Sequence, residues 1–251
     1  MIPNQILRVL SILEKHRVSY LLMGGQACVL YGAAEFSRDM DVTVLASPDN
    51  VERLGTAVEE LNGQVVAIPP FQKRYLDRGH AVHFWCRDPS GDGIRLDVMS
   101  KMRGVDEFPQ LWARRAIVAL EDDTEVPVLA LPDLVAAKKT QRDKDWPMVR
   151  RLVESNYQAF YDQPDSTRIQ FWLRELRTPE LLIEAVDRFP AEAQAAVATR
   201  EAVEAARRGD LDAVRRAFDD EVARERAADR TYWAPLRREL EQLRWSRGDT
   251  T

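Results

Sequence analysis

Short β-like segments alternate with helical segments through about residue 130. Runs rich in β-branched and aromatic residues, bounded by turn residues, predict strands over 18–23, 40–45, 64–68, 81–87 and 94–99. Apolar residues recur at helical spacing over 6–13 and 51–61, and Ser47-Pro48 is typical of a helix start. Helices therefore interleave with strands in this part, which predicts a mixed sheet with flanking helices.

The β pattern disappears after Leu131. Pro132 opens a predicted helix, which Pro147 must break or restart because proline lacks the amide hydrogen. Further helix starts are predicted at Asp165-Ser166, Thr178-Pro179, Pro190 and Asp210, with Gly209 as a helix stop. The boundary is expected in the polar stretch near 122–132. We thus expect an α/β domain over 1–130 and an all-α domain over 131–251.

Composition excludes several classes of protein. The formal net charge is −5, from 36 Lys+Arg and 41 Asp+Glu, which disfavours a strongly basic nucleic-acid coat but allows a local basic patch. No apolar run approaches the ~20 residues that span a bilayer, and the first five residues do not resemble a signal peptide. Two cysteines, Cys28 and Cys86, provide neither a disulfide framework nor a cysteine-based zinc site and are expected in the core. We expect a cytoplasmic protein with no membrane contact.

Two glycines stand between a predicted strand and a predicted helix. Gly24-Gly25 follows the apolar run 18–23 and precedes the helix-compatible segment 26–31. Glycine permits a sharp turn and a close approach of the backbone to a ligand, and a helix N-terminus favours an anion. The turn is therefore a candidate phosphate site, although such a turn on its own is more often simply structural.

A pair of carboxylates opens the next predicted strand. Thirteen residues separate Gly25 from Asp39, and Asp41 follows two positions later, so both carboxylates point to one face of the strand. Adjacent carboxylates repel each other, and a divalent cation such as Mg²⁺ would remove that repulsion. The alternative is that one Asp caps a turn while the other is exposed at a sheet edge.

A third carboxylate lies in the second strand of a predicted hairpin. Segments 81–87 and 94–99 flank the Gly-rich turn 88–93, and their apolar residues alternate onto one face. The opposite face carries His83, Trp85, Arg95 and Asp97. Asp97 could join the Asp39–Asp41 pair, with His83 and Arg95 near an acceptor substrate; a solvated outer face is the alternative for His83, Trp85 and Arg95. His80 and His83 would face opposite ways on a strand, which disfavours zinc.

Basic residues concentrate after the predicted α/β domain. Lys138 and Arg142 are expected on one face of a helix over 132–145, close to Lys139, Lys144, Arg150 and Arg151. The face could hold a γ-phosphate or an RNA backbone, or it could simply be solvated. Asp145 is expected to cap the helix that follows it. The aromatic and basic segment 71–78 is expected as a loop with a weak potential for acceptor binding.

These motifs together resemble the DNA polymerase β-like nucleotidyltransferase superfamily. The resemblance rests on Gly24-Gly25, thirteen intervening residues, Asp39-Met40-Asp41, a later strand Asp and the Lys139, Arg142, Lys144, Asp145 signature. It is nearest to the small bacterial branch of abortive-infection-type toxins and covers about residues 18–155. Where many relatives carry Arg before the Asp pair, this chain has Glu35; Ser37 offers a hydroxyl and Arg38 a cation near the phosphates instead.

The resemblance implies a metal-dependent transfer of an NMP group from an NTP to a hydroxyl acceptor. Asp39, Asp41 and Asp97 would be catalytic and bind Mg²⁺, or Mn²⁺, in a two-metal arrangement. The nucleotide would contact Gly24, Gly25, Ser37, Arg38, Lys138, Lys139 and Arg142, while His83, Arg95 and Lys144 are candidate acceptor contacts. The acceptor would be RNA (including tRNA), a protein or a small molecule, and a cognate antitoxin is a candidate partner. The alternative is a non-catalytic nucleotide- or RNA-binding protein on the same fold.

Overall fold

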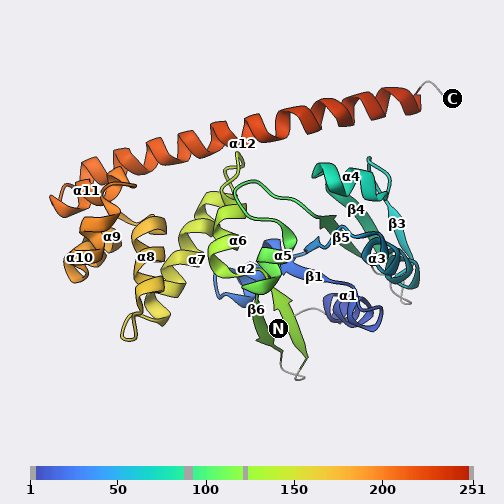
Figure 1. Ribbon diagram of the computed structural model, residues 1–251, viewed down its shortest axis with the longest axis horizontal. Helices are drawn as coiled ribbons and strands as arrows, with labels where there is room; N and C mark the ends of the chain where they lie inside the picture. The colour runs from blue at the N-terminus through green and yellow to red at the C-terminus, as the bar shows by residue number, and fades with distance from the viewer. Residues whose placement is uncertain (1–3, 88–92, 121–123, 249–251) are drawn as a thin grey trace. The chain divides into compact units, whose positions relative to one another are not determined.

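A computed structural model describes residues 4–87, 93–120 and 124–248. The chain divides into two compact units (Figure 1). The first comprises 1–30, 34–137 and 232–251, and the second comprises 31–33 and 138–231. Residues 88–92 of the expected hairpin turn and residues 122 and 123 of the expected boundary lie outside the described residues, as do residues 1–3, 121 and 249–251.

A mixed seven-stranded sheet forms the centre of the first unit. Its strands are β1 (Tyr20–Met23), β2 (Met40–Val44), β3 (Gly63–Val65), β4 (Val82–Arg87), β5 (Gly93–Met99), β6 (Ala116–Ala119) and β7 (Glu125–Val128). Their order across the sheet is β3-β4-β5-β2-β1-β7-β6. The β2–β5 and β1–β7 pairs are parallel, and the other neighbouring pairs are antiparallel.

Helices interleave with these strands up to residue 138. They are α1 (Asn4–Lys15), α2 (Gly24–Leu30), α3 (Pro48–Glu60), α4 (Lys73–Arg78), α5 (Phe108–Ala113) and α6 (Leu131–Lys138). Beyond α6 the chain is all-helical: α7 (Asp145–Ala159), α8 (Ser166–Glu175), α9 (Pro179–Arg188), α10 (Pro190–Ala196), α11 (Glu201–Arg207) and α12 (Leu211–Gly248). The predicted fold class, a mixed sheet with helices followed by an all-α region, is confirmed.

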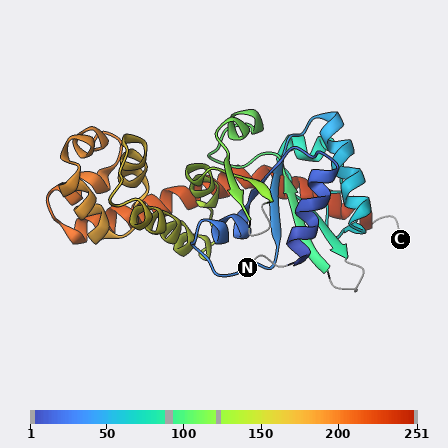
Figure 2. The same ribbon diagram turned by 90° about the horizontal axis from the view of Figure 1, so that it is seen from below.

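The alternating pattern of the hairpin strands determines their two faces. Along β5, Ile94, Leu96 and Val98 are buried, while the residues between them are partly exposed. The buried face packs against helices, and α1 and α3 lie side by side against the sheet (Figure 2). The apolar face of α1, which includes Ile6 and Leu13, is fully buried. β5 therefore has one core face and one partly exposed face that carries its polar residues, whereas β1 is buried along its whole length.

Local capping explains where several helices begin. The Ser47 hydroxyl accepts from the Asn50 amide, the Asp165 carboxylate accepts from the Arg168 amide, and Asp210 accepts from the Ala213 amide. Proline stands in the first turn of α3, α9 and α10, where its missing amide hydrogen costs nothing. These helix starts are confirmed, and Gly209 follows α11 with a φ of +66°.

The last helix, α12, contributes to both units. Its residues up to Thr231 belong to the second unit and those from Tyr232 belong to the first. The later part is attached to the first unit by Glu239, which accepts from Nε2 of buried His80 at 2.9 Å and pairs with Arg78. Pro235 lies inside this helix. Among the described residues, no helix is long and apolar enough to cross a membrane.

Three sequence predictions are wrong. The helix expected over 132–145 ends at Lys138, because the loop that follows is closed by its own hydrogen bonds. In that loop, Asp145 accepts from the Thr140 hydroxyl at 2.5 Å and from Arg142 Nε at 2.7 Å. Asp145 is consequently the first residue of α7 rather than its cap. The segment over 73–78 forms helix α4 instead of a loop.

Candidate active site

The Gly24-Gly25 turn is in direct contact with Asp41, the second acid of the pair. Gly24 follows β1 with a φ of +66°, and a Cβ built there would stand 1.9 Å from Asp41 Oδ2. A Cβ on Gly25 would stand 2.3 Å from the Ser37 hydroxyl. The Gly25 amide lies 3.4 Å from Asp41 Oδ2. Both positions therefore require glycine, because a side chain would displace Asp41 or Ser37.

Two of the three carboxylates lie opposite each other on neighbouring strands. Asp41 on β2 and Asp97 on β5 are register partners in a parallel pair. Asp39 lies in a bend just before β2 and is exposed, and its charge acts on Arg95 as that of Asp41 does. Met40 and Val42, which alternate with these acids, are fully buried. The core face of β2 thus fixes the direction of the acidic face.

Asp97 already has two partners. Its Oδ1 accepts from Arg95 Nε at 2.7 Å and lies 2.8 Å from His83 Nδ1, and His83 is its register partner on β4. Burial alone would raise the pKa of Asp97, but the hydrogen bonds from His83 and Arg95 outweigh burial and lower the pKa. Asp97 is therefore held as a carboxylate.

The charges of all three acids act on the guanidinium of Arg95. The pKa of Arg95 is raised first by its hydrogen bond to Asp97, and further by the charges of Asp97, Asp39 and Asp41. Asp39, Asp41 and Asp97, together called the acidic edge below, therefore all act on Arg95. The three negative charges of these acids exceed the one positive charge of Arg95.

The donor chemistry suits a hard divalent cation, because Mg²⁺ prefers carboxylate oxygens. As the side chains stand, however, no group of three or more His, Cys, Asp or Glu in the described ranges converges as a metal ligand set. Asp97 is turned to Arg95 and His83. A cation held by all three acids would thus have to draw Asp97 away from Arg95.

Ser37 and Arg38, the predicted phosphate contacts before the Asp pair, differ in how firmly their side chains are held. The Ser37 hydroxyl donates to the Asp39 carbonyl at 3.1 Å, and the Ser37 carbonyl accepts from Gln26 at 2.8 Å. Ser37 is therefore fixed beside the glycine turn. Arg38 is exposed, with its guanidinium carbon 5.9 Å from the centre of the Phe36 ring.

The predicted basic residues belong to the second unit and form ion pairs within it. Lys139 binds Glu175, with Nζ 2.7 Å from Oε2. Arg142 binds Asp145, and Lys138 Nζ lies 3.8 Å from the same side chain. Lys144 is exposed. Because α6 ends at Lys138 and Arg142 lies in the loop that follows, the expected common helical face of Lys138 and Arg142 does not form.

Sequence reasoning missed a buried ionic cluster in the second unit. It joins α8, the start of α11 and α12 through Glu175, Arg177, Arg200 and Glu221. Glu221 stands 44 residues from Arg177 and 21 residues from Arg200, so no local spacing marks these pairs. The buried cysteines, by contrast, are core residues as expected.

Comparison with known proteins adds no relative: no family model matches the chain, and no curated protein matches it.

Proposed function

We propose that the protein is a metal-dependent nucleotidyltransferase that moves an NMP group from an NTP to a hydroxyl acceptor. The observation that carries this proposal is the pairing of Asp41 with Asp97 across parallel strands β2 and β5, directly beside the Gly24-Gly25 turn. The resemblance to the polymerase β-like superfamily requires a later strand Asp to meet the Asp pair. The parallel register supports that requirement.

The chemistry needs few side chains. Oxygen of the acceptor hydroxyl forms a bond to the α-phosphorus, the bond from that phosphorus to the bridging oxygen breaks, and pyrophosphate leaves while the hydroxyl loses its proton. Mg²⁺, when bound by Asp39, Asp41 and Asp97, neutralises phosphate charge and makes the acceptor hydroxyl easier to deprotonate. Ordering the two reactants supplies much of the remaining acceleration.

Each residue of the site has a defined task in this proposal. Asp39 and Asp41 hold the nucleotide-bound cation, and Asp97 serves the acceptor side. The backbone at Gly25 and the hydroxyl of Ser37 contact the phosphates. His83 fixes the orientation of Asp97 through its 2.8 Å contact, and Arg95 balances the acidic charge before substrate arrives.

The acceptor is proposed only as a hydroxyl on RNA, a protein or a small molecule. A role as the toxin of a toxin–antitoxin pair would follow if the acceptor were an essential RNA or protein.

A non-catalytic nucleotide- or RNA-binding role is the competing function. The observation that favours it is the engagement of Asp97 with Arg95 and His83, which leaves no three-residue metal set assembled in the described part of the chain. In that case the Arg95 guanidinium would offset part of the negative charge of the acidic edge without a metal. Three acids at a site for a phosphate anion would then have no chemical purpose.

The test is incubation of the full chain with each α-labelled NTP, Mg²⁺ or Mn²⁺, and total RNA or cell extract as the source of acceptor. We expect label to enter a macromolecule or a small product, and the labelling to require the metal. The Asp41→Asn variant is the negative control. NTP binding without labelled product from any nucleotide would support the non-catalytic alternative and overturn the proposal.

A further inference from the structure

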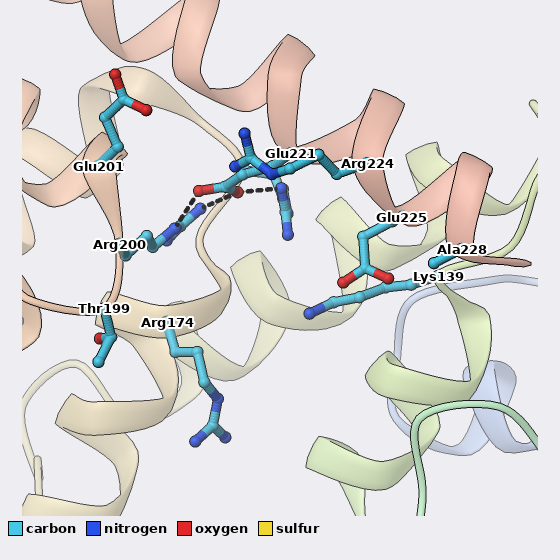
Figure 3. Close-up of a pocket in the computed structure, with 10 residues that line it drawn as sticks. Lys139, Arg174, Thr199, Arg200, Glu201, Glu221, Arg224, Glu225 and Ala228 are labelled. Carbon is cyan, nitrogen blue, oxygen red and sulfur yellow. Dashed lines mark hydrogen bonds and ion pairs between the residues drawn. The ribbon is translucent and has the colours of Figure 1, made fainter.

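The second unit contains a pocket of about 430 Å³ whose lining is dominated by cations. Its lining comes from the loop after α6, from α8, from the residues around the start of α11, and from α12 (Figure 3). Five of its ten lining residues are basic: Lys139, Arg174, Arg177, Arg200 and Arg224. Three are acidic: Glu201, Glu221 and Glu225.

Two buried carboxylates are shared among four of these cations. Glu175 pairs with Lys139 and Arg174, and it lies 3.9 Å from Arg177. Glu221 pairs with Arg177 and with Arg200, the latter at 2.9 Å from Nε to Oε1 (Figure 3). With Glu201, Glu225 and the rim residue Arg224 included, five cations face four carboxylates, so the pocket has one more positive than negative charge. Excess charge of this kind is costly where water is excluded.

Arg177 is a buried member of the network that has one unused donor. Its side chain is 8% exposed, and its Nε is buried without a hydrogen-bond partner among the described residues. Burial and the charge of Arg200 lower the pKa of Arg177. A buried guanidinium with an unused donor in the wall of a pocket indicates an anion as its missing partner.

The mouth of the pocket provides additional positive charge. Arg224 is exposed and forms no ion pair with any described residue. Arg174 is largely exposed, although its Nε lies 3.3 Å from Glu175 Oε1. Arg200, by contrast, has a structural task, since it donates to the carbonyls of Leu173 and Leu176. The rim cations can therefore be changed without removing the contacts that hold α8.

We propose that this pocket binds a small phosphate-bearing anion with several negative charges, either free pyrophosphate or the phosphates of a nucleotide. Arg177 and Lys139 supply buried donors, and Arg174 and Arg224 supply donors at the rim. Arginine presents a planar set of donors that matches phosphate oxygens. The volume falls within the range of small-ligand sites. The site does not depend on the transfer reaction proposed above.

The test is calorimetric titration of the full chain with sodium pyrophosphate, ADP or sodium sulfate, with EDTA present and ionic strength matched. The variants are Arg174→Gln and Arg224→Gln. Arg216→Gln is the control because it removes the same charge from an exposed position of α12 that does not line the pocket. Asp41→Asn tests whether binding occurs instead at the acidic edge of the first unit.

We expect one bound phosphate anion per chain and much weaker binding of sulfate. Arg174→Gln and Arg224→Gln should each weaken binding about tenfold, the effect of losing one charge-assisted hydrogen bond, while Arg216→Gln and Asp41→Asn leave it unchanged. Equal affinities for ADP and pyrophosphate would indicate that phosphate alone is recognised, whereas tighter ADP binding would indicate a nucleotide site. No binding, or binding that survives both rim variants, would overturn the proposal.

Discussion

The two units accumulate unbalanced charge of opposite sign. In the first, Asp39, Asp41 and Asp97 act on one guanidinium, that of Arg95. In the second, four cations share the carboxylates of Glu175 and Glu221. In each unit, oppositely charged side chains reduce the repulsion between the like charges: Arg95 does so for the acids, and Glu175 and Glu221 do so for the cations. The acidic edge therefore favours a cation and the basic pocket favours an anion, although the net charge of the chain is only −5.

The largest expected effect is on the stability of the basic cluster. Glu221→Gln removes the charge that Arg177 and Arg200 share, and breaking a buried pair from one side costs about 3–5 kcal/mol of unfolding free energy. Denaturant titration measures the change. Glu180→Gln is the matched control, because its pair with Arg215 is exposed and should contribute less than about 1 kcal/mol. Equal losses in the two variants would contradict the buried cluster.

The acidic edge should show its largest effect in turnover. Asp97→Asn keeps the shape of the side chain but removes its charge, so nucleotidyl transfer should fall at least ~10²-fold, the lower end for losing a general base. Affinity for Mg²⁺-NTP should change little, whereas Asp41→Asn should reduce both affinity and turnover. Asp49→Asn, at an exposed position on α3, is the control for charge alone. Transfer by Asp97→Asn at the unmodified rate would remove Asp97 from the site.

Substitutions at Gly24 and Gly32 distinguish the cost of backbone strain from an effect on Asp41. Gly24→Ala combines an unfavourable positive φ with a collision at Asp41, and we expect a loss of at least about 2 kcal/mol together with a large loss of activity. Gly32→Ala meets the same positive φ but no atom within 4 Å, so strain of about 1 kcal/mol should be its only effect. Thermal unfolding and transfer assays on both variants make the comparison. Similar activity in the two would show that Gly24 does not support Asp41.

The balance of charge at the acidic edge can be shifted through Arg95. Arg95→Gln removes a cation on which all three acids act, so we expect Mg²⁺ to bind several-fold more tightly and to raise the unfolding temperature more than in the unmodified chain. Lys101→Gln, which removes an exposed cation paired with Glu107, is the control. Magnesium titrations followed by calorimetry and thermal unfolding measure both effects. Unchanged affinity in Arg95→Gln would show that Arg95 does not compete with the metal.

The smallest expected effect is a pH dependence at Glu221. Burial raises the pKa of Glu221, but the hydrogen bonds and charge of Arg200 outweigh it, so the folded-state pKa is below 4.5. A depressed pKa contributes stability that is fully present above the unfolded-state value and is lost as the pH falls through the folded-state value. The unfolding free energy should therefore decline as the pH falls below about 4.5, and Glu221→Gln should decline less steeply. Identical slopes would contradict this contribution.

The sequence predicts the acidic edge far better than the basic pocket. Gly24-Gly25 and the Asp pair lie within one strand–helix–strand unit, and alternation alone assigns Asp39 and Asp41 to one face. The placement of Asp97 beside Asp41 follows from the register of β2 and β5, and it was expected only because of the resemblance to a known superfamily. The ionic cluster of the second unit joins residues from three helices, and long-range packing of that kind leaves no local spacing in the sequence.

The strands β6 and β7 escaped prediction for a different reason. Each has four residues, Pro127 interrupts the second, and β6 at the sheet edge has no buried residue. Such short edge strands lack the clear alternation of β4 and β5. The end of α6 at Lys138 was also missed, because it depends on hydrogen bonds to Thr140 and Asp145 rather than on a proline or glycine.

The most direct test of the contrast between the two units is a paired titration, with Mg²⁺ and with pyrophosphate, of the unmodified chain, Asp41→Asn and Arg224→Gln. We predict that Asp41→Asn loses the binding of Mg²⁺ and keeps that of pyrophosphate. Arg224→Gln should show the reverse: it should keep its affinity for Mg²⁺, and its affinity for pyrophosphate should fall about tenfold. Loss of both ligands in one folded variant, or loss of neither in both variants, would contradict two separate sites of opposite charge.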